Sequence, residues 1–356
     1  MARREDIGNS EMADRTVVMN DGEQERPHAN ITRPAPKDIP KCPLCKIDLR
    51  PSTQASFQSQ GRYYCPTCGY VYDSSIDLKP GTEIVGKYRI LKTLGSGGFG
   101  DIYLCHPIND LKTRYVLKVL RDVTTPESQK RFEREARLLK MMTPPVIVKF
   151  IDYWMAYSGA YIVMEYVDGV NLNDIFKHYD IDEGATLQIA LEIAKALKFC
   201  WDIGKIVHRD IKPSNIMINN NMEVKLLDFG MAKQTNHETA DITASNAGIG
   251  TPKYMSPEQY RNAKSVDFRS DIYSLGVTMY FLLKRETPFS GNNFIEIYKD
   301  TVKNSPPSRM AFNGICSNEC ASLIQHMMQL YPDKRPESYD VLIDEIKSVL
   351  NKLEGN

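Results

Sequence analysis

Residues 208–215 read His-Arg-Asp-Ile-Lys-Pro-Ser-Asn, and Asp-Phe-Gly follows at residues 228–230. The first string carries a carboxylate, an ammonium group and a side-chain amide, and the second adds another carboxylate. A proton acceptor, a cation and two oxygen ligands for magnesium are the parts that phosphoryl-transfer sites combine. We therefore expect the rest of the chain to supply a phosphate-binding loop and a second cation.

The size and charge of the chain limit what else it can be. Its 356 residues suit about two domains at roughly 100–200 residues each. Lys+Arg and Asp+Glu both number 45, so the balance does not call for nucleic acid or an anionic membrane surface as a partner. No apolar run reaches the ~18 residues of a membrane span, and the first residues lack an apolar signal segment. We expect a cytoplasmic protein without a membrane span.

The chain changes character along its length. Residues 1–40 are polar and poor in aromatic side chains, which predicts a disordered tail. Residues 41–77 hold two closely spaced cysteine pairs, and Lys79-Pro80-Gly81 follows as a boundary. Beyond it come five β-rich runs spaced like the strands of an antiparallel sheet, namely YRILKTL, DIYLCHP, YVLKVL, IVKFIDYW and YIVMEYV.

Helical patterns dominate the second half of the chain. One helical segment, 126–142, already interrupts the β-rich runs. After Glu165, apolar residues at helical spacing predict amphipathic helices at 185–202, 267–283, 318–330 and 339–353. A β-rich half followed by an α-rich half predicts an α+β protein with two lobes.

The glycine-rich segment Gly-Ser-Gly-Gly-Phe-Gly at residues 95–100 lies between two of the β-rich runs. Such glycines let the backbone approach phosphate oxygens closely. A dinucleotide-binding fold uses the same spacing, but it needs a helix to open at the third glycine. Residues 101–104 are strand-like instead. We therefore predict a β-hairpin over the phosphates.

Lys118 is the one charged residue of an otherwise apolar strand. It is either an edge lysine that reaches water or a phosphate-binding lysine that a carboxylate orients. Glu135, on the only helix of the β-rich half, is the expected carboxylate. Glu133 is the competing candidate, although it would project from a different face of the helix.

With these motifs in place, residues 84–354 resemble the eukaryotic-type serine/threonine protein kinases that also occur in bacteria. The resemblance covers about three-quarters of the chain, and its motifs come in the family's order. It implies a bilobal protein kinase fold with a β-rich and an α-rich lobe. Beyond the motifs named above, it extends to Ser256-Pro257-Glu258, to a buried Asp271, and to Arg335 as the partner of Glu258.

The resemblance also implies catalytic roles. Asp210 would orient the substrate hydroxyl or accept its proton. Asn215 and Asp228 would hold Mg²⁺ or Mn²⁺, and Lys118, held by Glu135, would contact the α and β phosphates of ATP. Lys212 would neutralise the transferred phosphate and is typical of the serine/threonine class, as is Thr251. His208 would have a packing role only.

The same resemblance implies the ATP site. Met164 stands at the gatekeeper position, and Glu165-Tyr166-Val167 at the hinge that contacts adenine. One departure from the family pattern is Val116, which replaces the usual alanine and narrows the adenine pocket. The expected ATP-binding residues are Leu94, Gly95, Ser96, Gly97, Gly98, Phe99, Gly100, Ile102, Val116, Lys118, Met164, Glu165 and Val167.

Three functions compete on these residues. The first is a non-specific serine/threonine kinase that acts on protein substrates, and the second is a pseudokinase scaffold. The third is a small-molecule kinase, which the full activation segment disfavours. Since no catalytic residue of the family is missing, we expect the first.

Arg209 could pair with a phosphorylated loop residue, so we expect autophosphorylation at Thr243 and Ser245, with a second copy of the chain as a candidate partner. Loops are rich in such hydroxyls in any case.

Cys42, Cys45, Cys65 and Cys68 form two C-x-x-C pairs separated by nineteen residues. This spacing is typical of a four-cysteine zinc site, and the segment resembles a zinc ribbon. Its second pair is also similar to a rubredoxin knuckle, so iron is the rival metal, and disulfides are a third reading. A segment of this size would need its metal to fold.

The function of this module is left open by the sequence. It holds few basic residues, which argues against a nucleic-acid-binding surface and favours a protein partner or a structural role. The remaining cysteines are scattered through apolar or mixed surroundings, and we expect them to be small buried or neutral residues. They are Cys105, Cys200, Cys316 and Cys320.

Overall fold

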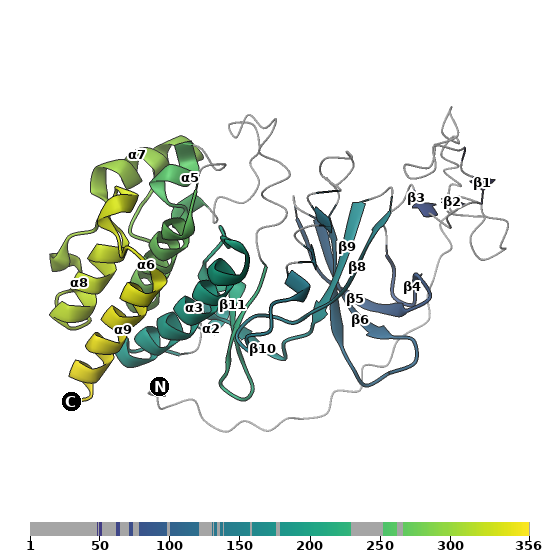
Figure 1. Cartoon of the computed structure of the whole chain (residues 1–356), viewed down its shortest axis with the longest axis horizontal. Helices are drawn as coiled ribbons and strands as arrows, with labels where there is room; N and C mark the ends of the chain where they lie inside the picture. Colours follow the sequence, from purple (N-terminus) through teal and green to yellow (C-terminus); the bar gives the residue numbers. More distant parts are fainter. Residues whose placement is uncertain are drawn as a thin grey trace, which may run out of the picture. The chain divides into compact units, whose positions relative to one another are not determined.

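The computed structural model divides the chain into two compact units, residues 2–75 and residues 76–356 (Figure 1). The residues that the structure describes are 48, 50–51, 62–64, 71–73, 78–97, 100–120, 130, 132–133, 136–137, 139–156, 159–175, 179–228, 252–261 and 266–355.

The first unit contains a three-stranded antiparallel sheet in the order β1-β2-β3. Its strands are β1 (Arg50–Pro51), β2 (Arg62–Tyr64) and β3 (Val71–Asp73). Tyr63 of β2 stands opposite Tyr72 of β3. The four cysteines predicted to bind a metal, Cys42, Cys45, Cys65 and Cys68, lie outside the described residues, as does the predicted tail at 1–40.

The second unit opens with an antiparallel sheet of six strands in the order β4-β5-β6-β7-β9-β8. All five predicted β-rich runs form strands, although the fourth begins only at Phe150, and β4 was not predicted. The strands are β4 (Glu83–Ile84), β5 (Tyr88–Gly97), β6 (Gly100–Pro107), β7 (Tyr115–Leu120), β8 (Phe150–Ala156) and β9 (Gly159–Glu165).

Strand β7 shows how this sheet separates two apolar clusters. Side chains alternate between the faces of a strand, so Leu117 and Val119 share one face and join a cluster that contains stacked Trp154 and Tyr161. Leu120, on the face of Lys118, packs in a second cluster with buried residues of the helical segment around 130–140. The described residues between 130 and 140 are helical, as the sequence predicts, whereas Met141 and Met142, which the prediction included, are not.

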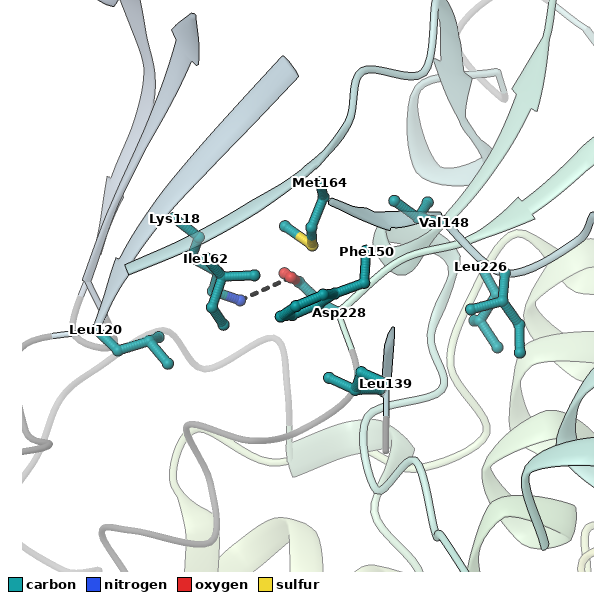
Figure 2. Close-up of a pocket in the computed structure, with 10 residues that line it drawn as sticks. Lys118, Leu120, Leu139, Val148, Phe150, Ile162, Met164, Leu226 and Asp228 are labelled. Atoms are coloured by element: carbon teal, nitrogen blue, oxygen red, sulfur yellow. Dashed lines mark hydrogen bonds and ion pairs between the residues drawn. The ribbon is translucent and has the colours of Figure 1, made fainter. Parts of the chain in front are cut away.

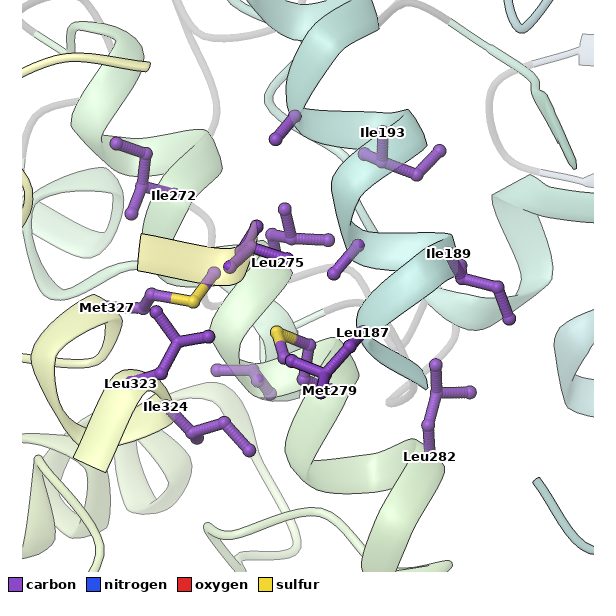
Figure 3. Close-up of a cluster of buried hydrophobic side chains, with 14 of the residues drawn as sticks. Leu187, Ile189, Ile193, Ile272, Leu275, Met279, Leu282, Leu323, Ile324 and Met327 are labelled. Atoms are coloured by element: carbon purple, nitrogen blue, oxygen red, sulfur yellow. The ribbon is translucent and has the colours of Figure 1, made fainter. Parts of the chain in front are cut away.

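The helical part of the second unit is built around α6 (Phe268–Lys284), most of whose side chains are buried. It packs between α3 (Glu183–Gly204) and α8 (Asn318–Met327), and Leu187, Leu275 and Leu323 meet in this core (Figure 3). The predicted helix at 339–353 is α9 (Tyr339–Leu353). Further helices are α2 (Leu172–Ile175), α5 (Pro257–Arg261) and α7 (Phe294–Asn304).

Capping side chains define where these helices begin. Asp182, Asp267, Ser317 and Ser338 each accept a backbone hydrogen bond at the first turn of α3, α6, α8 and α9. The α+β, two-lobed architecture expected from the sequence is confirmed. No helix among the described residues has the length and apolar character needed to cross a membrane.

A second small sheet was not predicted. It consists of β10 (Gly169–Asn171), β11 (Ile216–Asn219) and β12 (Val224–Leu226), all antiparallel. The turn between β11 and β12 is stabilised by Asn219, whose side-chain oxygen accepts hydrogen bonds from the amides of Asn221 and Glu223. Strand β11 follows the 208–215 string and β12 leads into Asp228, so this hairpin joins the 208–215 string to Asp228.

Main-chain hydrogen bonds join β12 to the segment that precedes β8. Ile147 forms a parallel bridge with Leu226. The amide of Val148 donates to the carbonyl of Leu226 at 3.1 Å, and the amide of Leu226 donates to the carbonyl of Val146 at 2.6 Å. Main-chain hydrogen bonds therefore connect the sheet-rich part of this unit to its helix-rich part at Leu226.

Candidate active site

The backbone of the 208–215 string is hydrogen-bonded to a buried carboxylate, that of Asp271. Asp271, in the first turn of α6, is fully buried. Its Oδ2 accepts the amide of His208 at 2.7 Å, and its Oδ1 accepts the amide of Arg209 at 2.8 Å. Burial raises the pKa of Asp271 to about 7, although both backbone hydrogen bonds oppose this shift. The expected buried aspartate is therefore present, and it fixes the backbone of the loop.

His208 lies inside the protein, as a packing role requires. It is fully buried. Its Nδ1 accepts the amide of Asp210 at 3.3 Å, so the proton is assigned to Nε2, which donates to the carbonyl of Leu227 at 2.8 Å. His208 thus links the loop of Asp210 to the residue directly before Asp228.

Two bends of the site place non-glycine residues in the left-handed region. The backbone φ is 66° at Arg209 and 51° at Asp228. Such a conformation costs roughly 1–2 kcal/mol, and it persists where surrounding bonds fix it. The bonds from Asp271 and from His208 to Leu227 provide that support on either side of the site.

Asp210, Lys212 and Asn215 form one polar cluster. The Lys212 Nζ lies 3.0 Å from Asp210 Oδ2. The Asn215 Nδ2 donates to the same Oδ2 at 3.0 Å and to the Asp210 carbonyl at 2.8 Å. Since these bonds occupy the amide nitrogen of Asn215, its Oδ1 is the atom suited to a metal ion. The Asp210 carboxylate is held by two donors, as an orienting group requires.

The side-chain oxygens of Asn215 and Asp228 are suited to binding magnesium. The Leu227 amide donates to the Asn215 carbonyl at 2.8 Å, which ties Asn215 to the residue next to Asp228. Magnesium is usually bound by one or two protein oxygen ligands together with substrate phosphates. Among the described residues no group of three or more His, Cys, Asp and Glu side chains could hold a metal ion. A two-ligand site completed by a nucleotide is consistent with both observations.

Lys118 of β7 reaches across the site to Asp228. Its Nζ lies 2.7 Å from Asp228 Oδ1 (Figure 2), and both side chains are partly buried. The expected partner, Glu135, lies outside the described residues, so the Lys118–Glu135 pair stays a prediction. The alternative partner, Glu133, is described and partly buried.

A cavity of about 30 Å³ lies beside this ion pair. It has room for about one water molecule, whereas ligand pockets take roughly 300–1,000 Å³. Lys118 and Met164 of the predicted ATP site line it, together with Asp228, the predicted magnesium ligand. Its other walls are apolar (Figure 2), formed by Leu120, Leu139, Ile147, Val148, Phe150, Ile162 and Leu226.

The glycine-rich segment spans the end of β5 and the start of β6, which pair as a hairpin. Gly95 pairs with Ile102, and Gly97 with Gly100. The hairpin prediction is confirmed, and a dinucleotide-type helix is excluded at Gly100. Gly98 and Phe99 lie outside the described residues. On β7, Val116 stands opposite Met164 in register, and its predicted contact with adenine stays a prediction.

The predicted hinge contains an ion pair that was not expected from the sequence. The Nζ of Lys225, on β12, lies 2.9 Å from Glu165 Oε1. The Glu165 amide also donates to the Lys149 carbonyl at 2.9 Å. The pair joins the hinge to the strand that leads into Asp228. Its partners lie 60 residues apart in the sequence, so only a prediction of the β11–β12 hairpin could have suggested it.

The predicted Glu258–Arg335 pair is confirmed. Arg335 Nη1 and Nη2 lie 2.6 and 2.9 Å from the two carboxylate oxygens of Glu258. Burial acts to raise the pKa of Glu258, but the hydrogen bonds and charge of Arg335 bring it below its usual value. Nearby, Gln259 Nε2 donates to the Arg209 carbonyl at 3.1 Å, which connects α5 to the 208–215 string. Thr243, Ser245 and Thr251 lie outside the described residues.

Solved structures with the same fold include protein kinases. Rad53 (residues 1–466), in complex with AMP-PNP, is 26% identical with a TM-score of 0.61, and the match covers 73% of this chain and 64% of that one. A mutant form of the PknI kinase domain of Mycobacterium tuberculosis has a TM-score of 0.59 at 22% identity, over 77% of this chain and 99% of that one. The second likeness concerns the fold alone.

Curated relatives agree with the fold. The serine/threonine-protein kinase pkn2 of Myxococcus xanthus is 33% identical over 281 residues, which cover 75% of this chain and 33% of that protein. The serine/threonine-protein kinase PknB of Mycolicibacterium smegmatis is 36% identical over 257 residues, 70% of this chain and 40% of that protein. The chain thus spans about a third to two-fifths of the length of these relatives. Residues 88–347 match the protein kinase domain family, and the chain belongs to it.

Proposed function

We propose that this chain is a serine/threonine protein kinase that transfers the γ-phosphate of ATP to hydroxyl groups of proteins. The observation that carries the proposal is the Asp210 carboxylate, held by Lys212 at 3.0 Å and by Asn215 at 3.0 Å. Proton acceptor, cation and metal-binding amide meet there as this chemistry needs them. The names of the curated relatives support the serine/threonine class.

In this proposal each residue has one task. Asp210 orients the attacking hydroxyl or accepts its proton. Asn215 Oδ1 and Asp228 would hold magnesium, which offsets the charge of the phosphates. Lys118 neutralises the α and β phosphates, and Lys212 the transferred group. The hinge and the β5–β6 hairpin would bind adenine and the phosphate chain.

Transfer of radiolabelled phosphate from ATP to a generic protein substrate tests the proposal. Asp210→Asn should lower the transfer rate about 100-fold or more, with ATP binding retained. Asp202→Asn is the matched control, because Asp202 pairs with Lys198 at 2.6 Å on the exposed side of α3. Normal ATP binding without transfer by the unmodified protein under any divalent ion would favour the scaffold reading instead.

Activation by autophosphorylation at Thr243 and Ser245 is part of the proposal. Its support is Arg209, which directly precedes Asp210 and whose carbonyl is bonded to α5, since a phosphorylated loop can be ordered by such an arginine. Peptide mapping after incubation with ATP should find phosphate at these two residues. Phosphate elsewhere, with residues 235–251 unmodified, would contradict it.

We further propose that residues 41–77 form a zinc-binding module. Supporting this, β2 and β3 flank Cys65 and Cys68 in the sequence, as strands flank a zinc-ribbon knuckle. Elemental analysis should find about one zinc per chain, lost in Cys42→Ser and kept in the control Cys316→Ser. Iron in place of zinc would indicate a rubredoxin-like centre. If the protein contains neither zinc nor iron, the proposed metal-binding module is refuted. A module of this kind would recruit a protein partner or support the fold.

A further inference from the structure

Two cysteines flank the N-cap of helix α8. Cys316 directly precedes the capping residue Ser317, and Cys320 lies in the first turn of the helix. The Cys320 amide donates to Ser317 Oγ at 3.1 Å, and the Cys316 amide donates to the Phe312 carbonyl at 3.4 Å. Both cysteines are free thiols. Their backbone positions are therefore fixed on either side of one cap.

Both side chains meet the same apolar core, because Cys320 belongs to the buried cluster and Cys316 packs against that cluster. Interaction with the Cys320 side chain lowers the pKa of Cys316, and the Ala321 amide adds to this effect. Burial and the nearby Glu183 carboxylate oppose the shift. The same interaction, together with burial, raises the pKa of Cys320. Cys316 is therefore the sulfur that ionises first.

Solvent exposure also favours Cys316 over Cys320 as the attacking sulfur. Cys316 is partly exposed, whereas Cys320 is fully buried beneath it in the helical core. An attacking thiolate must be reachable by its oxidant, and a resolving thiol must only reach the first sulfur. Cys105 and Cys200 differ, because both are buried and burial raises the pKa of each to about 12.

We propose that Cys316 and Cys320 form a redox-active dithiol, in which Cys316 attacks and Cys320 resolves. The oxidant is a hydroperoxide such as hydrogen peroxide. The Cys316 thiolate attacks one peroxide oxygen, the O–O bond breaks, and the leaving hydroxide takes a proton to become water, so that Cys316 becomes a sulfenic acid. The Cys320 sulfur then attacks the Cys316 sulfur, its proton leaves with the hydroxyl as a second water, and a disulfide forms. Two thiols are oxidised and one peroxide is reduced.

The surroundings hold the pair in place for this reaction. The Glu183 carboxylate, at the start of α3, accepts the Ser317 amide at 2.8 Å and the Ser317 hydroxyl at 2.5 Å. The cap between the two cysteines is thus anchored to a neighbouring helix. None of these residues belongs to the cluster of Asp210, so the inference does not depend on the proposed kinase activity.

Peptide mapping of the folded full chain tests the dithiol. Trypsin cuts after Arg309 and Lys334, so one peptide, residues 310–334, holds both cysteines and no other. The native protein is exposed to hydrogen peroxide, its free thiols are then alkylated, and it is unfolded and digested. The peptide should lose about 2 Da, the mass of two hydrogens, and escape alkylation. Dithiothreitol should reverse the change, while Cys105 and Cys200 stay reduced.

Single variants assign the order of the steps. In Cys320→Ser, Cys316 should accumulate as a sulfenic acid that dimedone traps, whereas in Cys316→Ser, Cys320 should stay reduced. Thermal melting checks that each variant is folded, and the unmodified protein gives the primary result in any case. The proposal is overturned if Cys316 and Cys320 remain alkylatable after peroxide treatment, or if they oxidise no faster than Cys105 and Cys200.

Discussion

The Nζ of Lys118 lies 2.7 Å from Oδ1 of Asp228, although 110 residues separate them in the sequence. Lys118 comes from the central strand β7 of the six-stranded sheet, and Asp228 follows β12 of the small sheet (Figure 2). The pair joins the proposed phosphate-binding lysine to a proposed magnesium ligand. The two parts of the unit therefore each contribute one charge to the site.

Replacing Lys118 tests this relationship. Lys118→Met removes the cation but keeps most of the apolar stem, so kcat/KM for ATP should fall about 100-fold or more through lost electrostatic stabilisation. The free energy of unfolding should change by less than about 1 kcal/mol, because Asp228 stays partly solvated. Lys195→Met, which removes a surface pair with Glu192, should leave activity unchanged. Full activity in Lys118→Met would refute the assigned role.

Arg335→Leu should destabilise the protein strongly. It leaves the largely buried Glu258 without its partner, and breaking such a pair costs about 3–5 kcal/mol. Arg335 holds the pKa of Glu258 low in the folded state, so the stabilisation is present above the ordinary Glu pKa and lost as pH falls through the lowered value. In urea unfolding the loss should therefore shrink toward acidic pH. Lys334→Leu, at an exposed neighbouring position, should be nearly neutral.

Gly276 allows α6 and α8 to pack closely. A Cβ at this position would lie 2.8 Å from Met328 Cγ and 3.0 Å from Met327 Cβ. Gly276→Ala should therefore cost about 1–3 kcal/mol through overpacking, partly offset by helix propensity. At Gly184 a Cβ meets its neighbours only at 3.6 Å. Gly184→Ala should be neutral or stabilising by up to about 1 kcal/mol. Equal melting temperatures for the two variants would argue against the close contact.

His326 should make stability depend on pH. It lies 3.0 Å from Glu345, and this hydrogen bond raises the pKa of His326. The stabilisation is fully present below the unfolded pKa of about 6.5 and is lost as pH rises through the raised folded value. Both side chains are about one-third exposed, so screening limits the effect to less than about 1 kcal/mol. His326→Gln should lose more stability at pH 5.5 than at pH 8.5, and an identical loss at both would contradict the pair.

Much of the fold was predictable because its elements are long and regular. The amphipathic pattern of α9 gave both helix ends, and α3 was predicted to within two residues at each end. The strands of the small sheet were missed because each has only three or four residues and pairs with distant sequence. The predicted helix at 318–330 ends earlier, at Met327, and residues 328–331 are not helical.

The contacts of the candidate site were also predictable only in part. The motif residues Asp210 and Asn215 were predicted to act together, and the structure brings them within hydrogen-bonding distance. The Lys118–Asp228 and Lys225–Glu165 pairs were not predicted. Which carboxylate meets a lysine depends on how two sheets approach each other, and no local pattern encodes that distance.

The bridge between Ile147 and Leu226 restricts how the cleft can open. Two main-chain hydrogen bonds, from Val148 and from Leu226, accompany it. A rigid-body rotation that admits a nucleotide from the front either turns about these bonds or breaks them, and buried main-chain bonds are costly to break. The sheet-rich and helix-rich parts of this unit should therefore rotate relative to each other about this segment, with the smallest displacement beside Met164 and a larger one at strands β5 and β6.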